Sequence, residues 1–256
     1  MNPLVKFLFE LQEISFLVWR SVTGLIKGPR YIGEIIRQMD LIGVGSLAII
    51  ILTGFFTGGV LILQTYPTLA YYGGQSEAGR AVATSLIREL GPVLSALMVA
   101  GRVGSAISAE LGSMVVSQQI DAMRALGTSP IRKLVTPRVI ALILMLPLLT
   151  VAADIFGIIG GGVVASQIFN LDNSLYITSV RYGVTIQDLI GGVIKPTFFA
   201  FIIGFVSCHK GLTTEGGTVG VGNSTTSAVV LSSILVIIAD FFISRLLQAV
   251  FGASRI

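Results

Sequence analysis

Charged residues are scarce in this chain of 256 residues, since Asp, Glu, Lys and Arg together make up 12% of it. A soluble domain usually carries about 25% charged residues. Hydrophobic residues account for 53% of the chain, and its mean hydropathy is +0.88. The 30 glycines are spread through the apolar runs, which is typical of helices that pack closely inside a bilayer. The composition excludes an ordinary soluble fold and predicts an all-α integral membrane protein.

Cysteine and histidine each occur once, as Cys208 and His209. A single cysteine excludes a disulfide framework or a thiolate metal cluster within the chain. A single histidine, with no H-E-x-x-H or G-x-S-x-G motif, makes a histidine-based hydrolase improbable. We therefore expect no catalytic residue, no metal site and no cofactor in this chain.

A phosphate-binding loop is also missing, because the chain contains no G-x-x-x-x-G-K-[ST] motif and no Gly-Lys dipeptide. The glycine-rich stretch 216–222 resembles such a loop only loosely, and we expect it to be a flexible loop. If ATP drives this protein, another subunit must bind it. The net charge of +4 does not indicate nucleic acid, because the basic residues flank apolar spans.

Apolar runs long enough to cross about 30 Å of hydrocarbon predict five transmembrane helices. They extend approximately over Leu41–Leu63, Leu86–Val116, Val139–Phe169, Leu189–Cys208 and Ala228–Gly252. Basic residues concentrate in residues 1–40 and in the segment 117–138, which favours a cytoplasmic N-terminus by the positive-inside rule. An odd number of spans then places the C-terminus on the periplasmic side. No removable signal peptide is visible.

The segment 1–40 precedes the five-span domain, 41–256. Its polar residues Lys6, Glu13, Arg20 and Lys27 recur every seven residues, while apolar and aromatic residues form another face. This pattern predicts an amphipathic helix that lies in the membrane interface. A soluble amphipathic helix packed against a partner is the alternative.

Small residues recur every fourth position in spans two and three, which lets another helix approach closely. They are Ala96, Ala100, Gly104, Ser108 and Gly112 in span two, and Ala153, Gly157, Gly161 and Ala165 in span three. The pattern does not distinguish packing within one subunit from a dimer interface.

Six ionisable residues fall at membrane depth, where each costs roughly 2.5–3.5 kcal/mol. They are Arg102, Glu110, Asp154, Lys195, Asp240 and Arg245. We expect Arg102 and Glu110 to pair with charges among the other four, either for stability or for transport. Arg88 and Glu89 precede Gly91-Pro92, which predicts a kink that frames a cavity.

Sequence motifs in and after span two resemble the MlaE (YrbE) permease family. They run over Leu86–Val93, Ala100–Ala106, Ala109–Met114, Asp121–Met123, Thr136–Arg138 and Leu146–Thr150. The resemblance implies a homodimeric permease in the cell inner membrane, with a cytoplasmic ABC ATPase dimer, a periplasmic ring of MCE-domain subunits and a possible small cytoplasmic accessory subunit. It also implies transport of phospholipids or related hydrophobic molecules between inner and outer membranes, which maintains outer-membrane lipid asymmetry.

A short cytoplasmic coupling helix is expected between spans two and three. Its sequence resembles in part the E-A-A-x-x-x-G coupling loop of ABC permeases, with Met in place of the second Ala and Asp in place of Glu. The coupling residues would be Asp121, Ala122, Met123, Arg124, Leu126 and Gly127, with Gly127 as the C-cap. An ordinary basic loop is the alternative interpretation.

A lipid site is expected near spans one, two and five, between two copies of the chain. Its candidate residues are Leu61, Leu63, Gln64, Tyr66 and Leu69, with Arg88 and Glu89 near a head group. Two other functions remain open. A secondary transporter would use Glu110, Asp154 or Asp240 as proton carriers, and a scaffold would only anchor a periplasmic lipid shuttle.

Overall fold

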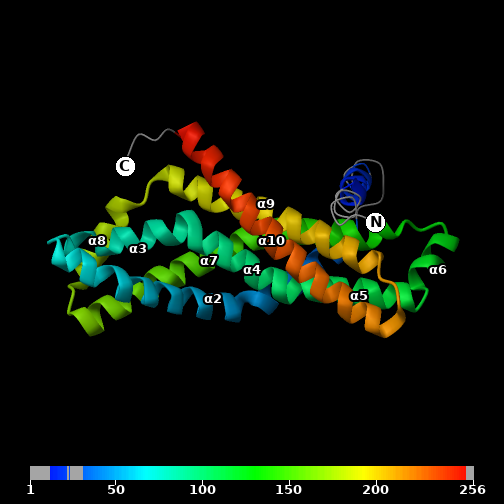
Figure 1. Ribbon diagram of the computed structural model, residues 1–256, viewed down its shortest axis with the longest axis horizontal. Coiled ribbons are helices and arrows are strands. Elements are labelled where there is room, and N and C mark those ends of the chain that lie inside the picture. Colours follow the sequence, from blue (N-terminus) through cyan, green and yellow to red (C-terminus); the bar gives the residue numbers. More distant parts are fainter. Residues whose placement is uncertain (1–11, 22, 24–30, 252–256) are drawn as a thin grey trace, which may run out of the picture. The chain divides into compact units, whose positions relative to one another are not determined.

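The computed structural model describes residues 12–21, 23 and 31–251, and these residues are almost entirely helical (Figure 1). The N-terminal helix covers residues 12–21. Five stretches are long and apolar enough to cross a membrane: Ile32–Tyr71, Gln75–Val116, Ile131–Phe169, Ile186–Leu212 and Gly217–Val250. The predicted all-α membrane fold with five spans is therefore confirmed. Lys6 and Lys27 of the predicted polar face lie outside the described residues, and the interfacial position of the segment 1–40 stays a prediction.

The spans consist of long helices and short π-helical turns. Span one is α2 (Ile32–Tyr71), and span two combines α3 (Ala78–Ser85), η2 (Leu86–Leu90), α4 (Gly91–Val99), η3 (Ala100–Gly104) and α5 (Ser105–Val116) after the short turn η1 (Gln75–Glu77). The short helix α6 (Gln119–Ala125) and the turn η4 (Ile131–Val135) lead into α7 (Thr136–Phe169). The helices α8 (Asn173–Gly183), α9 (Ile186–Leu212) and α10 (Gly217–Phe251) follow.

The helices extend beyond the predicted spans, and one predicted loop is wrong. Residues 217–222 were expected to be flexible, but they form the first turns of α10. Gly216 and Gly217 have positive φ angles of 89° and 67°, which reverse the chain before the helix begins. The backbone at Gly220 then lies so close to the Glu215 carbonyl that a Cβ would collide with it. These glycines serve a tight reversal, which the sequence pattern alone does not separate from flexibility.

The contacts of the chain divide it into two compact units. The first unit contains Met1–Ile42, Val99–Met145 and Phe199–Ile238, and the second contains Gly43–Met98, Leu146–Phe198 and Ala239–Ile256.

In the second unit, α3 and α8 lie side by side (Figure 1). Their shared core includes Val82 and Tyr176, and the Tyr176 hydroxyl donates a hydrogen bond to the Ile158 carbonyl at 3.0 Å. Burial raises the pKa of this hydroxyl above its ordinary value. At the start of α8, the hydroxyl and the backbone N–H of Ser174 both donate to Asp172 and lower the pKa of that carboxyl. The Tyr176 bond joins α8 to α7, and the Ser174 bonds cap the start of α8.

Small residues allow close packing within each unit. In the second unit, a Cβ at Gly54 or Gly58 of α2 would collide with the backbone of Ala153 or Gly157 of α7. In the first unit, a Cβ at Gly112 of α5 would lie 2.7 Å from the Thr214 hydroxyl. At these positions the small-residue stripes therefore pack within one chain, and the first of the two interpretations above is confirmed.

We expect Gly58→Ala to destabilise the protein by about 1–3 kcal/mol, because its methyl group overpacks a closed helix contact. Gly33→Ala, near the start of the same helix α2, is the matched control, since no atom of the described residues lies within 4 Å of the position that its Cβ would occupy. Thermal unfolding of the detergent-solubilised protein measures both. Equal midpoints for the two variants would contradict the close contact between α2 and α7.

Candidate functional site

Lys195 lies at the centre of a charged cluster in the second unit. Its side chain is 2% exposed, and its Nζ lies 2.6 Å from Glu89 Oε2 and 3.1 Å from Asp240 Oδ1. Ser244 donates a hydrogen bond to Glu89 at 3.2 Å. The cluster therefore joins span two, span four and span five through one buried ammonium group.

The local backbone explains the third contact of Lys195. Pro92 has no N–H, so it leaves a carbonyl of the preceding turn without its usual helical donor. Lys195 Nζ donates to the Arg88 carbonyl at 2.6 Å, four residues before Pro92. The predicted break at Gly91-Pro92 takes the form of the wide π-helical turn η2, in which the Gly91 N–H bonds to the Leu86 carbonyl. Lys195 thus supplies the hydrogen bond that the proline removes.

Arg88 is held by the start of α9. Its Nε donates to Asp188 Oδ1 at 2.5 Å, and Asp188 also accepts hydrogen bonds from the N–H and hydroxyl of Thr185, both at 2.8 Å. The Arg88 side chain remains 53% exposed, whereas that of Asp188 is 5% exposed. Arg88 is therefore oriented by one carboxylate while much of its guanidinium stays accessible.

The six charges expected at membrane depth differ in burial within the chain. Asp154 and Lys195 are buried and Asp240 is half-buried, whereas Arg102, Glu110 and Arg245 are exposed or partly exposed. Depth along a span does not determine whether a side chain faces another helix of the same chain. Lys195 and Asp240 pair with each other, which was not predicted.

Glu110 does not pair with any of the partners proposed for it. It pairs with Arg138 in the first unit, at 2.8 Å. Arg138 immediately precedes the predicted third span, where a basic residue indicates only topology, which is why sequence reasoning missed the pair. Asp154, in the second unit, lies against Gly91, and its Oδ1 has no hydrogen-bond partner among the described residues.

The apolar candidates for a lipid site divide into two groups. Leu61, Tyr66 and Leu69 pack against the core of the second unit, whereas Leu63 and Gln64 are exposed. An open groove of about 490 Å³ lies on the second unit. Its lining residues are Leu52, Thr53, Phe56, Thr57, Val60, Leu61 and Leu90. Of the candidates, Leu61 lines this groove. Leu90 comes from η2, and the other lining residues precede Leu61 on α2.

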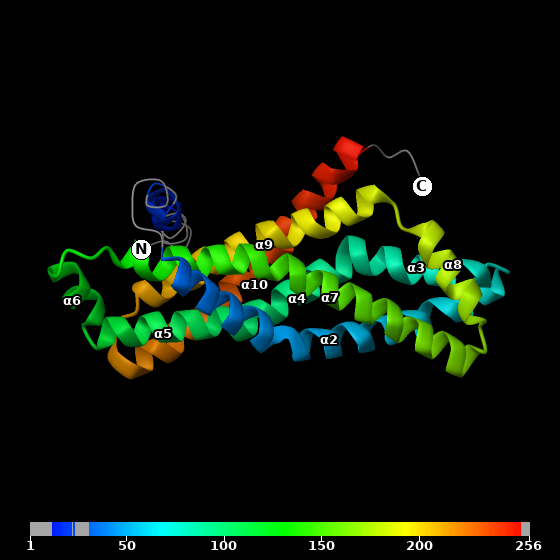
Figure 2. The same ribbon diagram turned by 180° about the vertical axis from the view of Figure 1, so that it is seen from behind.

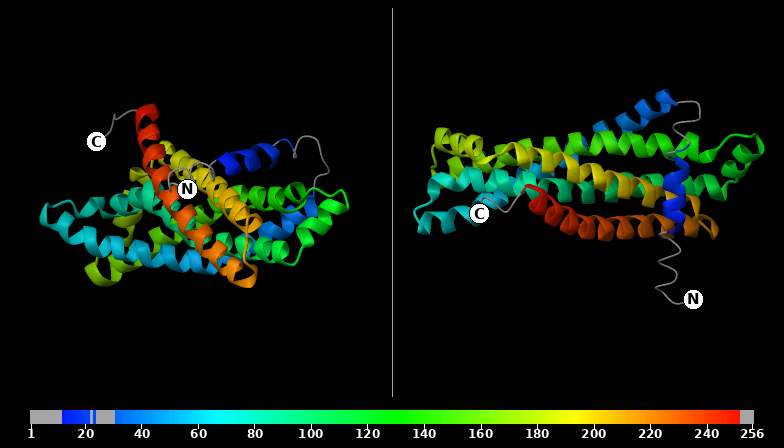
Figure 3. Two further views of the ribbon diagram at one scale, coloured as in Figure 1. Left: turned by 45° about the vertical axis from the view of Figure 1, so that its right-hand side comes forward. Right: turned by 90° about the horizontal axis from the view of Figure 1, so that it is seen from above.

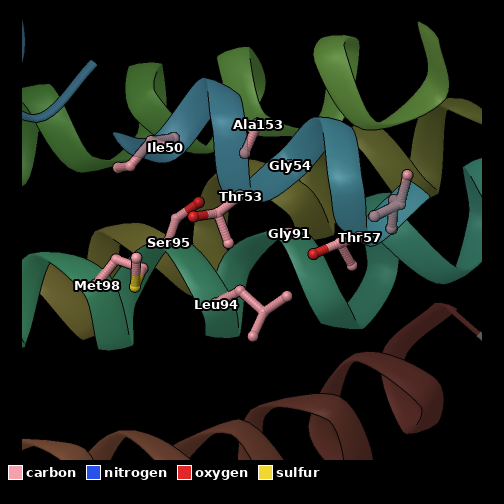
Figure 4. A pocket seen from close by; sticks show the side chains of 10 residues that line it. Ile50, Thr53, Gly54, Thr57, Gly91, Leu94, Ser95, Met98 and Ala153 are labelled. Carbon is pink, nitrogen blue, oxygen red and sulfur yellow. The ribbon is translucent and has the colours of Figure 1, made fainter. Parts of the chain in front are cut away.

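A small cavity lies between α2, α4 and α7 in the second unit, and Thr53 and Thr57 line it as they line the groove (Figure 4). Its volume is about 10 Å³, close to the space that one water needs. Ser95 lies beside Thr53 in this cavity, and its buried hydroxyl has no hydrogen-bond partner among the described residues. Thr53 and Thr57 of α2 thus place hydroxyl groups in the lining of an otherwise apolar groove.

The short helix α6 forms between spans two and three, in the first unit (Figure 2). Gln118, with a φ of 59°, turns the chain into it, and Asp121 pairs with Arg124 at 2.9 Å. The helix ends in a Schellman motif, in which the Gly127 N–H bonds to the Arg124 carbonyl at 3.0 Å and the Thr128 N–H to the Met123 carbonyl at 2.9 Å. Gly127 has the expected positive φ, 73°. The predicted short helix and its glycine end are confirmed.

The surface of α6 is open to a partner. Asp121, Ala122 and Arg124 are exposed, Met123 is half-buried, and Leu126 is 83% exposed at the end of the helix. The coupling role of these residues stays a prediction.

The N-terminal helix belongs to the first unit (Figure 3). Its Leu17 and Ser21 are buried, while Phe16 and Trp19 are exposed. Glu13 lies 3.6 Å from His209 of α9. The described part of the amphipathic segment therefore has one face on the protein and an aromatic face directed away from it.

Five apolar spans, a short exposed helix between two of them and charged groups inside the bundle define a multi-pass membrane protein of the permease class. The sequence model of the family described as "Permease MlaE" matches residues 35–246, and this chain belongs to that family.

Its relatives include a probable ABC transporter permease of Rickettsia typhi, 41% identical over 95% of this chain and 94% of the relative. A probable ABC transporter permease of Synechocystis is 40% identical over 91% of this chain and 88% of the relative. The chloroplastic protein TRIGALACTOSYLDIACYLGLYCEROL 1 of Arabidopsis thaliana is 36% identical over 93% of this chain and 68% of the relative.

Proposed function

We propose that this chain is the permease subunit of an ABC transporter that moves phospholipids or related hydrophobic molecules between inner and outer membranes and so maintains outer-membrane lipid asymmetry. The observation that carries the proposal is the apolar groove on α2. Its volume of about 490 Å³ falls in the usual range for small-molecule sites, roughly 300–1,000 Å³. The name of the Arabidopsis relative refers to a diacylglycerol lipid, which supports a lipid cargo here.

A lipid would place an acyl chain in the groove and its head group near Arg88. Leu52, Phe56 and Val60 supply apolar contacts for the chain. The guanidinium of Arg88, oriented by Asp188 and half-exposed, is suited to a phosphate. Glu89 is held by Lys195, and we propose that it orients the cluster beside the head group.

The energy for transport would come from a separate cytoplasmic ABC ATPase dimer, because this chain lacks a phosphate-binding loop. We propose that the ATPase binds α6, and that the chain itself has no enzymatic activity and needs no cofactor. The complete transporter would contain two copies of this chain, a periplasmic ring of MCE-domain subunits and a small cytoplasmic accessory subunit.

The proposed location is the cell inner membrane, with the N-terminus in the cytoplasm and the C-terminus in the periplasm. Basic residues near α6 support this orientation, since Arg124, Arg132 and Lys133 lie between spans two and three or at their ends. The same orientation puts α6 on the side of the membrane where ATP is available.

Reconstitution tests this function. The complex of this chain with its ATPase, in vesicles containing a fluorescent phospholipid, is expected to move lipid when ATP is added and to stop when the ATPase is left out. Lipid movement that persists without the ATPase would refute the proposal.

A proton-coupled mechanism is the second candidate, and the buried Asp154 is the observation that favours it. Glu110 and Asp240, the other proposed proton carriers, are both ion-paired within the chain. We therefore expect a proton ionophore to leave ATP-driven lipid movement unchanged. Loss of movement with the ionophore while ATP hydrolysis continues would favour the proton-coupled mechanism.

A further inference from the structure

Glu110 and Arg138 form an ion pair that joins α5 to the first turn of α7 in the first unit. Arg138 Nη2 lies 2.8 Å from Glu110 Oε2, and Arg138 Nη1 donates to the Leu134 carbonyl at 2.9 Å. The Arg138 side chain is 2% exposed, whereas that of Glu110 is 53% exposed. One guanidinium therefore binds a neighbouring helix and the turn η4 that precedes its own helix.

This pair closes the segment that carries α6. All residues between Glu110 and Arg138 belong to the end of α5, to α6, to the connection through η4 or to the first turn of α7 (Figure 2). Along the chain, α6 is joined to the membrane helices through α5 on one side and through η4 and α7 on the other. The pair links α5 and α7 near the ends to which α6 is joined.

Helix α9 packs against both helices that the pair joins, α5 and α7. A Cβ at Gly211 would lie 2.7 Å from Leu111 of α5, and a Cβ at Gly204 would lie 3.2 Å from Val139 of α7. Close packing of this kind transmits displacement instead of absorbing it. In the first unit, α5, α7 and α9 therefore form one stiff group beside α6.

Stability alone does not account for a buried arginine at this place. Removing a guanidinium from water is costly, and replacing a buried ion pair with apolar residues of similar volume is often neutral or stabilising. The Nε of Arg138 has no hydrogen-bond partner among the described residues, so the pair is not fully compensated. Unlike apolar packing, a charge-assisted hydrogen bond has a defined geometry, so it fixes the position of one helix relative to the other.

We propose that the Glu110–Arg138 pair is a clamp that makes α5 and α7 move together when the ATPase displaces α6. Glu110 and Arg138 are then positioning residues for the coupling of ATP hydrolysis to lipid movement. This inference rests on the proposed function and deepens it. Without the clamp, α6 moves but the displacement is not shared by both helices.

The experiment compares Glu110→Gln with the wild-type complex and measures ATP hydrolysis and lipid movement in the same vesicles. The amount of lipid moved per ATP is expected to fall at least about fivefold, the lower end of usual coupling between sites, while ATP hydrolysis continues. Glu77→Gln, which removes an acid from the exposed pair with Arg80, is the matched control and should leave the ratio unchanged. An unchanged ratio in Glu110→Gln overturns the clamp.

A double variant separates the clamp from a general loss of stability. Glu110→Leu with Arg138→Met replaces the pair by apolar residues and is expected to assemble like the wild type but to keep the low ratio. Recovery of the wild-type ratio in this variant would overturn the role of the ion pair. If Glu110→Gln alone fails to assemble, the double variant decides the question.

A cargo-independent measurement distinguishes this proposal from the proposed function. On addition of the ATPase and a non-hydrolysable ATP analogue, amide hydrogen exchange is expected to change in α6, α5 and the first turns of α7. In the double variant the change should remain in α6. If hydrogen exchange changes in the same helices of both proteins, the clamp is overturned, whether or not the cargo is a lipid. Failure of the vesicle assay in the wild type would instead refute the proposed function alone.

Discussion

Lys195→Met is expected to be among the most damaging single substitutions in this protein. It leaves the Glu89 and Asp240 carboxylates without their shared cation and the Arg88 carbonyl without its donor. Breaking a buried ion pair by removing one partner costs about 3–5 kcal/mol. We expect a marked drop in the thermal midpoint of the detergent-solubilised protein and loss of lipid movement.

Two further variants make this expectation specific. Lys133→Met removes an exposed lysine of η4 and should leave the thermal midpoint nearly unchanged. Adding Glu89→Gln and Asp240→Asn to Lys195→Met neutralises the stranded carboxylates and should restore part of the stability. A triple variant no more stable than Lys195→Met would show that the charges are not the cause.

Leu126→Glu is expected to uncouple the permease from its ATPase without unfolding it. The side chain is 83% exposed, so the fold should tolerate the charge, but a buried anchor of an interface typically contributes at least about 2 kcal/mol of binding free energy. That corresponds to a loss of affinity of roughly 30-fold. Co-purification of the ATPase with the tagged permease, together with ATP-driven lipid movement, measures the effect.

The control for this variant is Ile177→Glu on α8, where another exposed apolar residue receives the same charge. It should retain the ATPase. Asp121→Arg, which also breaks the pair with Arg124, should weaken ATPase binding in the same direction as Leu126→Glu. Normal ATPase binding in both α6 variants would contradict the coupling role of this helix.

The number of spans and the short helix between spans two and three were predictable from the sequence. Hydropathy reports where a helix enters hydrocarbon, but α2 begins at Ile32, well before the apolar run at Leu41. Backbone hydrogen bonds continue past the apolar region, so hydropathy gives the number of spans and not their ends. The end of α6 was predictable because a glycine at C′ has a local cause that the sequence displays.

The partners of the charges were not predictable in the same way. Asp188 and Arg138 each stand just outside a predicted span, yet they hold Arg88 and Glu110. Pairing depends on the rotation of each helix about its axis, which is set by packing against its neighbours. Rotation also separates the candidate lipid residues on α2, since exposure at Leu63 and partial burial at Leu61 differ by rotation and not by hydropathy.

The glycine contacts between α2 and α7 have a consequence for assembly. The backbone contacts of Gly54 and Gly58 are made inside the chain, whereas exposed positions along α10 such as Val230, Ile234 and Phe241 present bulky side chains. Side chains change rotamer far more easily than backbones slide past each other. We therefore expect the surfaces that shift during transport to be such side-chain surfaces. The contacting segments of α2 and α7 should move together as one rigid body.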